Sequence, residues 1–195
     1  MQLTQKLILA SQSKIRGQIL TGAGLPFTAM PSGVDEDVLK QAHDGDAASL
    51  AIKLAEAKAA QIEEDGLVIG ADQILQCGDR LFDKPRDMAE ARRNLQIFRG
   101  QTHYLVGGVV LQHKGETIWS HSQSVALTMR DFSDAFLDAY LEEAGEAILA
   151  SVGAYQLEGL GAHLFDKIDG DYFAILGLPL LPLLGALRQY GGLPA

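Results

Sequence analysis

Short apolar runs alternate along the chain with longer segments in which apolar residues recur at helical spacing. The runs at residues 6–10 and 67–71 are typical of strands buried on both faces. Between them, Leu50 and Leu54 lie on one face of the segment 47–64, which predicts an amphipathic helix. Alternation of strands with helices is typical of the α/β class of proteins.

The same patterns predict the remaining elements, and two turn signals add hairpins to the alternation. Gly78-Asp79 and Lys114-Gly115 each separate two β-rich stretches, as in antiparallel hairpins. The sequence therefore predicts an α/β fold with a mixed β-sheet and flanking helices, in one domain that spans residues 1–195. Further helices are expected at 15–20, 88–98, 134–143 and 180–188, and further strands at 27–30, 74–77, 80–82, 102–113, 117–127 and 162–168.

Composition narrows the classes of protein that the chain can belong to. The 195 residues are 47% hydrophobic and 21% charged, so a chain of this length has enough apolar side chains for a sizeable core. Cys77 is the single cysteine, which excludes an intramolecular disulfide and a cysteine-based zinc cluster. The five histidines lack the spacing of a metal motif.

Charge and apolar-run length indicate which partners and compartments to expect. The formal net charge of −9 disfavours long-range attraction to nucleic acid or to an anionic membrane. The apolar run at 7–10 is too short for a signal peptide, and the apolar tail at 174–187 is interrupted by glycine and proline. We therefore expect a cytoplasmic protein with neither nucleic acid nor membrane as a partner.

The segment from Ser11 to Arg16 lies between a buried strand and a helix. A helix N-terminus presents unpaired amides and a partial positive charge. The hydroxyls of the two serines and the positive charges of Lys14 and Arg16 would complete a pocket for phosphate. The alternative is a plain helix cap with two solvated cations.

Two further charged positions follow predicted strands. Asp72 comes directly after the run 67–71, where it could ligate Mg²⁺, accept a proton from water, or cap a loop. Lys84 precedes Pro85 just after the second strand of a hairpin, where it could neutralise a phosphate or be an ordinary surface lysine.

The glycine-rich segment 153–161 predicts a loop that approaches a ligand closely. Within it, Gln156 and Glu158 carry groups that can hydrogen-bond to the edge of a base. The segment has no dinucleotide-binding G-x-G-x-x-G pattern, so its glycines do not indicate a Rossmann fold.

In this order, the segments resemble the Maf family of nucleotide pyrophosphatases over nearly the whole chain. No single motif is highly specific, but eight of them occur in sequence. They are LILASQSKIR (7–16), SGVDE (32–36), LAEAKA (54–59), VIGADQIL (68–75), DKPRDMAEARRNL (83–95), GQTHYLVGGVVL (100–111), GAYQLEGLGAHLFDKIDGDY (153–172) and GLPL (177–180).

The resemblance implies hydrolysis of a nucleoside triphosphate between the α- and β-phosphates, which yields a nucleoside monophosphate and pyrophosphate. It also implies a divalent metal (Mg²⁺ or Mn²⁺), a cleft between two lobes, and a homodimer. Asp72 matches the catalytic proton acceptor, or equally a ligand of the metal, and Glu36 matches a second metal ligand. The positions that match phosphate-binding residues are Ser13, Arg16, Lys58 and Lys84.

Three positions bear on which base is preferred. Gln73 and Glu158 look like the family branch that acts on 7-methyl-GTP, whereas Ile15 stands where that branch usually has an aromatic residue. A carboxylate can accept hydrogen bonds from the N–H groups of guanine and would repel pyrimidine carbonyls. The alternatives are a pyrophosphatase of the dTTP/UTP type and a non-catalytic nucleotide-binding regulator of cell division, which would bind without turnover.

Overall fold

The computed structural model describes residues 3–194, which divide into two compact units. Unit 1 takes in the chain up to Gln73, the segment Val106–Gln123 and the chain from Asp171 onward. Unit 2 consists of Ile74–Leu105 and Ser124–Gly170. Each unit is therefore built from segments that are distant in sequence.

The strands of residues 3–194 form one mixed sheet of seven strands in the order β2-β1-β3-β5-β6-β7, with β4 paired to β3. β1 runs parallel to β2 and β3, whereas the pairs β3–β4 and β6–β7 are antiparallel. The predicted mixed α/β fold is confirmed. The strands are β1 (Leu7–Leu9), β2 (Thr28–Ala29), β3 (Leu67–Cys77), β4 (Arg80–Phe82), β5 (Thr102–His113), β6 (Glu116–Met129) and β7 (Phe165–Asp169).

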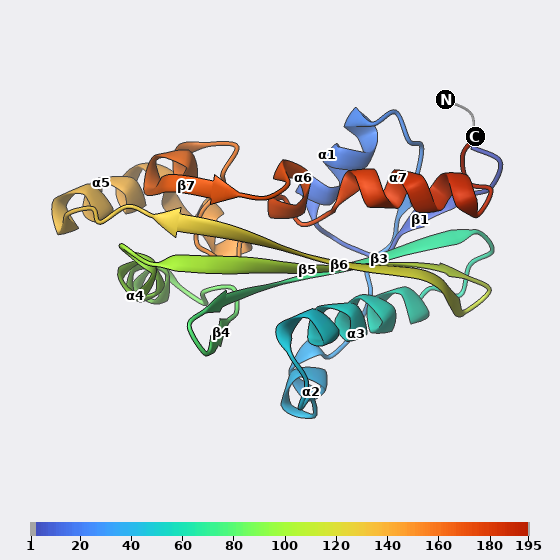
Figure 1. Cartoon of the computed structure of the whole chain (residues 1–195), viewed down its shortest axis with the longest axis horizontal. Helices are drawn as coiled ribbons and strands as arrows, with labels where there is room; N and C mark the ends of the chain where they lie inside the picture. The colour runs from blue at the N-terminus through green and yellow to red at the C-terminus, as the bar shows by residue number, and fades with distance from the viewer. Residues whose placement is uncertain (1–2, 195) are drawn as a thin grey trace. The chain divides into compact units, whose positions relative to one another are not determined.

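In unit 1, helices cover both faces of the sheet: α1, α6 and α7 lie on one face, and α2 and α3 on the other (Figure 1). Successive strand residues point to opposite faces, so Leu7 and Leu9 pack in the larger apolar cluster while Ile8 packs with Ala55 of α3. Because both faces are covered, β1 is buried along its whole length. The helices of unit 1 are α1 (Lys14–Gly22), α2 (Glu36–Gln41), α3 (Ala47–Ala60), α6 (Tyr172–Ile175) and α7 (Leu180–Gln189).

Unit 2 has a core rich in aromatic rings. Phe98 packs edge-on against Phe82, and the buried His103 contacts the rings of Phe98, Tyr155 and Phe165. Its β3–β4 hairpin turns at a glycine with φ +57°, as the sequence predicts. The helices of unit 2 are α4 (Met88–Phe98), α5 (Asp134–Ala144) and two 3-10 helices, η1 (Gly145–Ala150) and η2 (Leu160–Leu164).

Several sequence-based boundaries need correction. The strand expected at 74–77 is an extension of the strand at 67–71, and β3 continues unbroken to Cys77. Asp72 therefore lies inside a long strand and not at its carboxyl end. The strand expected at 162–168 is η2 followed by β7, and the helix expected to reach residue 64 ends at Ala60. The short helices α2 and α6 lack enough residues for a periodic pattern, so the sequence did not predict them. No helix in the described part of the chain is long and apolar enough to span a membrane.

Candidate functional site

The site is built on a close approach of α3 to the sheet in unit 1. A Cβ atom on Gly70 would collide with the carbonyl oxygen of Ala55, and one on Gly108 would come within 2.5 Å of that of Ala51. The two glycines therefore let the α3 main chain rest directly on β3 and β5. Ala51, Ala55 and Lys58 are spaced i, i+4 and i+7, so the same helix face presents the lysine to the sheet.

Lys58 joins two carboxylates. Its Nζ lies 2.5 Å from Oδ1 of Asp72, which is 6% exposed, and 2.7 Å from Oε1 of Glu36. Glu36 opens α2, whose N-cap is the side chain of Asp35. Burial favours a raised pKa for Glu36, but hydrogen bonds and charge from Lys58 and Lys40 outweigh it and lower the pKa below its usual value. Glu36 is therefore ionised at neutral pH.

Arg16 adds a second cation to this group. The Ser13 side chain caps α1, and Arg16 projects from the first turn of that helix. Its Nε donates to the Gly177 carbonyl at 2.8 Å, and its Nη1 donates to the Ala71 carbonyl at 2.9 Å and to Ser11 Oγ at 3.3 Å. Burial lowers the pKa of the guanidinium, while the charges of Asp72 and Glu36 act in the opposite direction. Arg16 is thus fixed by two main-chain carbonyls and a hydroxyl, within range of the charges of both carboxylates.

Gln73 and Ile15 occupy different environments within unit 1. The amide nitrogen of Gln73 donates to the carbonyls of Ala174 and Ile175 at 2.8 and 3.1 Å. Ile15 lines an apolar groove of about 330 Å³ with Phe173 and neighbouring residues of α1 and α7. The structure therefore places Gln73 next to Asp72 along β3 and Ile15 in an apolar setting.

Lys84 and Glu158 belong to unit 2. Lys84 is exposed just before the buried Pro85, in the connection that leads to α4. Glu158 is exposed in the turn before η2, where Gly161 packs so tightly on Gln156 that a Cβ would lie 2.5 Å from its carbonyl oxygen. Among the described residues 3–194, neither side chain has a polar contact of the kind that holds Arg16 and Lys58 in place.

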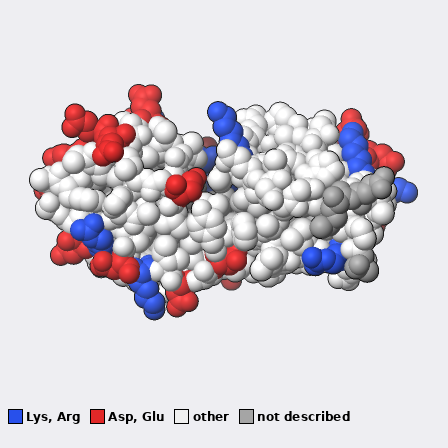
Figure 2. Space-filling view, turned by 90° about the horizontal axis from the view of Figure 1, so that it is seen from above, with Lys and Arg blue, Asp and Glu red and all other residues white. Residues whose placement is uncertain are grey.

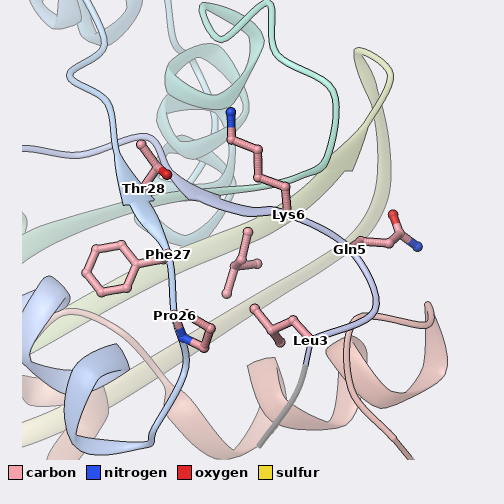
Figure 3. Close-up of a pocket in the computed structure, with 7 residues that line it drawn as sticks. Leu3, Gln5, Lys6, Pro26, Phe27 and Thr28 are labelled. Carbon is pink, nitrogen blue, oxygen red and sulfur yellow. The ribbon is translucent and has the colours of Figure 1, made fainter.

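A separate pocket of about 420 Å³ lies beside β1 and β2 and contains none of the predicted site residues (Figure 3). Figure 3 shows the polar ends of Gln5 and Lys6 turned away from the apolar side chains of Leu3, Pro26 and Phe27. Lys6 instead pairs with Glu64 at 2.7 Å. The described residues that line the pocket thus offer apolar surface but no convergent polar groups.

In unit 1 the structure brings Arg16, Glu36, Lys58 and Asp72 together from four elements. Within residues 3–194, no group of three or more His, Cys, Asp or Glu side chains could hold a metal. The acidic groups described at this site are therefore a pair, Glu36 and Asp72. Sequence reasoning missed Gly70, Gly108 and Gly177 as parts of the site. The signal for the first two was a glycine inside a strand opposite an alanine-rich helix face.

Curated relatives match this chain over nearly its full length. The nucleoside triphosphate pyrophosphatase of Granulibacter bethesdensis is 50% identical over 96% of this chain and 98% of its own. The 7-methyl-GTP pyrophosphatases of Rhizobium meliloti and Brucella suis are each 47% identical, over 97% and 96% of this chain and 98% and 97% of their own. Relatives with these two names thus match the chain to a similar degree.

A solved structure, lipoprotein GNA1162 from Neisseria meningitidis, matches with 15% identity and a TM-score of 0.28, over 75% of this chain and 99% of that one. A likeness this low carries no argument about fold or function. The family model described as Maf-like protein, by contrast, matches residues 6–190 and so takes in both units. Together with the relatives at 47–50% identity, this match shows that the chain belongs to the family of Maf-like proteins.

Proposed function

We propose that this chain hydrolyses a nucleoside triphosphate at the bond between the α- and β-phosphates. Water adds across that bond, and the products are a nucleoside monophosphate and pyrophosphate. The observation that carries the proposal is the meeting of Arg16, Glu36, Lys58 and Asp72 in a chain of the Maf-like family. We further propose that both units act as one domain, since the family match spans them.

The residues present suit a divalent metal. The ammonium group of Lys58 already bridges oxygen atoms of Glu36 and Asp72, which supports convergence of the two carboxylates on a single cation. Carboxylate oxygens are hard ligands, and Mg²⁺ commonly takes one or two of them together with water and substrate phosphates. Glu36 and Asp72 would hold Mg²⁺ or Mn²⁺, which supplies positive charge against the triphosphate when bound.

The chain's own side chains would supply the remaining charge and the base. A triphosphate carries about four negative charges, and phosphoryl transfer depends mainly on positioning and charge neutralisation. Arg16, Lys58 and Lys84 would provide cations, and the hydroxyl of Ser13 and the amides at the start of α1 would add donors. Asp72, whose Oδ1 accepts a hydrogen bond from Lys58, would take the proton of the attacking water or, as the alternative role, serve as a ligand of the metal.

Product analysis tests the reaction. We expect purified protein with Mg²⁺ to release pyrophosphate from at least one member of a panel of triphosphates, and Asp72→Asn to lower kcat by about 100-fold or more. Asp65→Asn makes the same chemical change at an exposed position of unit 1 and should leave kcat unchanged. Release of orthophosphate would instead indicate γ-phosphate cleavage, and saturable binding without turnover would favour a nucleotide-binding regulator of cell division.

For the substrate, we propose 7-methyl-GTP or another modified nucleotide. The side-chain nitrogen of Gln73 donates to carbonyls of α6, and its side-chain oxygen has no partner among residues 3–194, so this oxygen would accept an N–H from the substrate. The Glu158 carboxylate would accept guanine N–H groups, and Ile15 would contribute apolar contact with the base. In a panel of 7-methyl-GTP, GTP, dTTP and UTP, Glu158→Gln should lower kcat/KM for the guanine nucleotides alone. Glu142→Gln, on exposed α5 of the same unit, is the control.

We also propose a cytoplasmic homodimer that binds neither nucleic acid nor membrane. Figure 2 shows acidic side chains gathered at the α5 end of unit 2, and that helix exposes Asp134, Asp138, Glu142 and Glu143. Such a surface repels a phosphate backbone. Light scattering on the purified protein tests the dimer, and a mass of one chain, 20.9 kDa, would refute it.

A further inference from the structure

The short helix α6 is fixed at both ends, although it has only four residues. At its start, Asp171 Oδ1 accepts a hydrogen bond from the Ala174 amide at 2.8 Å. At its end, the Gly177 amide donates to the Ala174 carbonyl at 3.0 Å and the Leu178 amide to the Phe173 carbonyl at 3.1 Å. This pair of bonds is a Schellman motif, in which the residue at the position of Gly177 adopts a left-handed conformation.

Both residues next to Asp72 along β3 are tied to this turn. Gln73 reaches it directly, through its bonds to the carbonyls of Ala174 and Ile175. Ala71 reaches it through Arg16, whose guanidinium bridges the carbonyls of Ala71 and Gly177. Because Arg16 donates through both Nε and Nη1, its plane is fixed by main-chain atoms that cannot rotate away.

Two features require glycine at position 177. Its φ is +90°, a conformation that residues with a Cβ rarely adopt. In addition, a Cβ there would lie 3.3 Å from Nε of Arg16, which is tighter than ordinary van der Waals contact, and 3.4 Å from Nη2, at the lower limit of such contact. A side chain at this position would therefore strain the turn and also push the guanidinium away from its place.

We propose that Gly177 is a positioning residue, whose carbonyl oxygen and missing side chain set the guanidinium of Arg16 against the carbonyl of Ala71, the residue before Asp72 in β3. The inference rests on the proposed function, in which the positive charge of Arg16 binds a phosphate oxygen of the triphosphate. A Cβ at position 177 makes Arg16 give way by a few tenths of an ångström. Because a misplacement of about 1 Å costs up to about 100-fold in rate, this smaller shift should cost about threefold to tenfold. Gly177 itself does not touch the substrate.

Another glycine of unit 1 provides a matched control. Gly191 follows α7 with φ +75°, and the Gly192 amide donates to the Leu187 carbonyl, which matches the bond from the Leu178 amide to the Phe173 carbonyl after Gly177. A Cβ on Gly191 has Gln5 at 3.7 Å as its near neighbour and does not meet a site residue. Gly191→Ala therefore reproduces the backbone strain of Gly177→Ala without the contact on Arg16.

The experiment compares the two alanine variants in pyrophosphate release and thermal melting. Both should show a similar fall in Tm, while Gly177→Ala alone should lose about 3- to 10-fold in kcat. Gly177→Asn and Gly191→Asn form a second pair. Asparagine tolerates the left-handed conformation but carries a Cβ, so Gly177→Asn should recover Tm and keep the loss of kcat. This pair keeps the test decisive if Gly177→Ala does not fold.

A second readout follows the guanidinium independently of turnover. Hydrogen exchange at Arg16 Nε, assigned in NMR spectra by its loss in Arg16→Lys, should speed up at least tenfold in the Gly177 variants and not in the Gly191 variants. Full kcat together with slow exchange in Gly177→Asn would overturn the inference. A wild-type protein without turnover would instead defeat the proposed function, whatever the exchange rates show.

Discussion

His103 makes the stability of the protein depend on pH in a way that can be calculated. The side chain is completely buried in unit 2, where Nε2 lies 2.7 Å from the Tyr155 hydroxyl. Nδ1 is buried without a hydrogen-bond partner among residues 3–194. Burial lowers the pKa of His103 from 6.5 to about 4. The imidazole is therefore neutral in the folded protein at every pH above this value.

The unfolded chain takes up the proton first, because its histidine has the ordinary pKa. The contribution of His103 to the free energy of unfolding is thus complete above pH 6.5 and is lost as the pH falls toward 4. Between pH 7.5 and pH 5 the linkage relation gives a loss of about 2 kcal/mol from this one group.

Urea unfolding followed by circular dichroism at the two pH values measures this loss. His103→Gln removes the titrating group and keeps a polar atom for Tyr155, so its loss should be smaller than that of the wild type by about 2 kcal/mol. His163→Gln, at an exposed position of the same unit, should behave as the wild type does. Equal losses in all three proteins would refute the assignment of the pH dependence to the buried imidazole.

Three further changes test the packing and the charge network. Gly108→Ala should lower the free energy of unfolding by about 3 kcal/mol, because its Cβ meets the main chain of α3, and an unchanged thermal melt would contradict that contact. Gly185→Ala, within α7 and facing open space, should raise the free energy of unfolding by about 0.5–1 kcal/mol in the same melts. Because Lys58 and Lys40 hold the pKa of Glu36 below 4.5, stability from Glu36 is present above that pH and lost below it. In urea unfolding at a series of pH values, Glu36→Gln should therefore lose less free energy of unfolding below pH 4.5 than the wild type does. A loss as large as that of the wild type would argue against the pairing.

The elements with strong periodicity were predictable from the sequence. Helix α4 and strand β5 have the bounds that the pattern predicts. Both are long enough for the hydrophobic or β-forming pattern to extend over many residues. The short helices α2 and α6 are different, since six and four residues cannot show a period. Their caps, Asp35 and Asp171, identify them only once the backbone is known.

The sequence by itself determined the fold class and, through the order of its motifs, the family. It also identified Arg16, Glu36, Lys58 and Asp72 as candidates, because the type of a residue and its position in a motif can be read directly from the sequence. Whether they lie together depends on contacts between segments far apart in the chain, and such contacts leave no local periodic signal.

Only the tertiary structure decided how the site is held together. The glycines at 70 and 108 bring α3 onto the sheet, and Gly177 fixes Arg16 through a carbonyl oxygen. Every residue has a main-chain carbonyl, so the residue type does not indicate which carbonyl binds Arg16. The space beside a glycine is likewise defined by its neighbours in the fold. For that physical reason the side chains of the site were open to prediction and the backbone atoms that orient them were not.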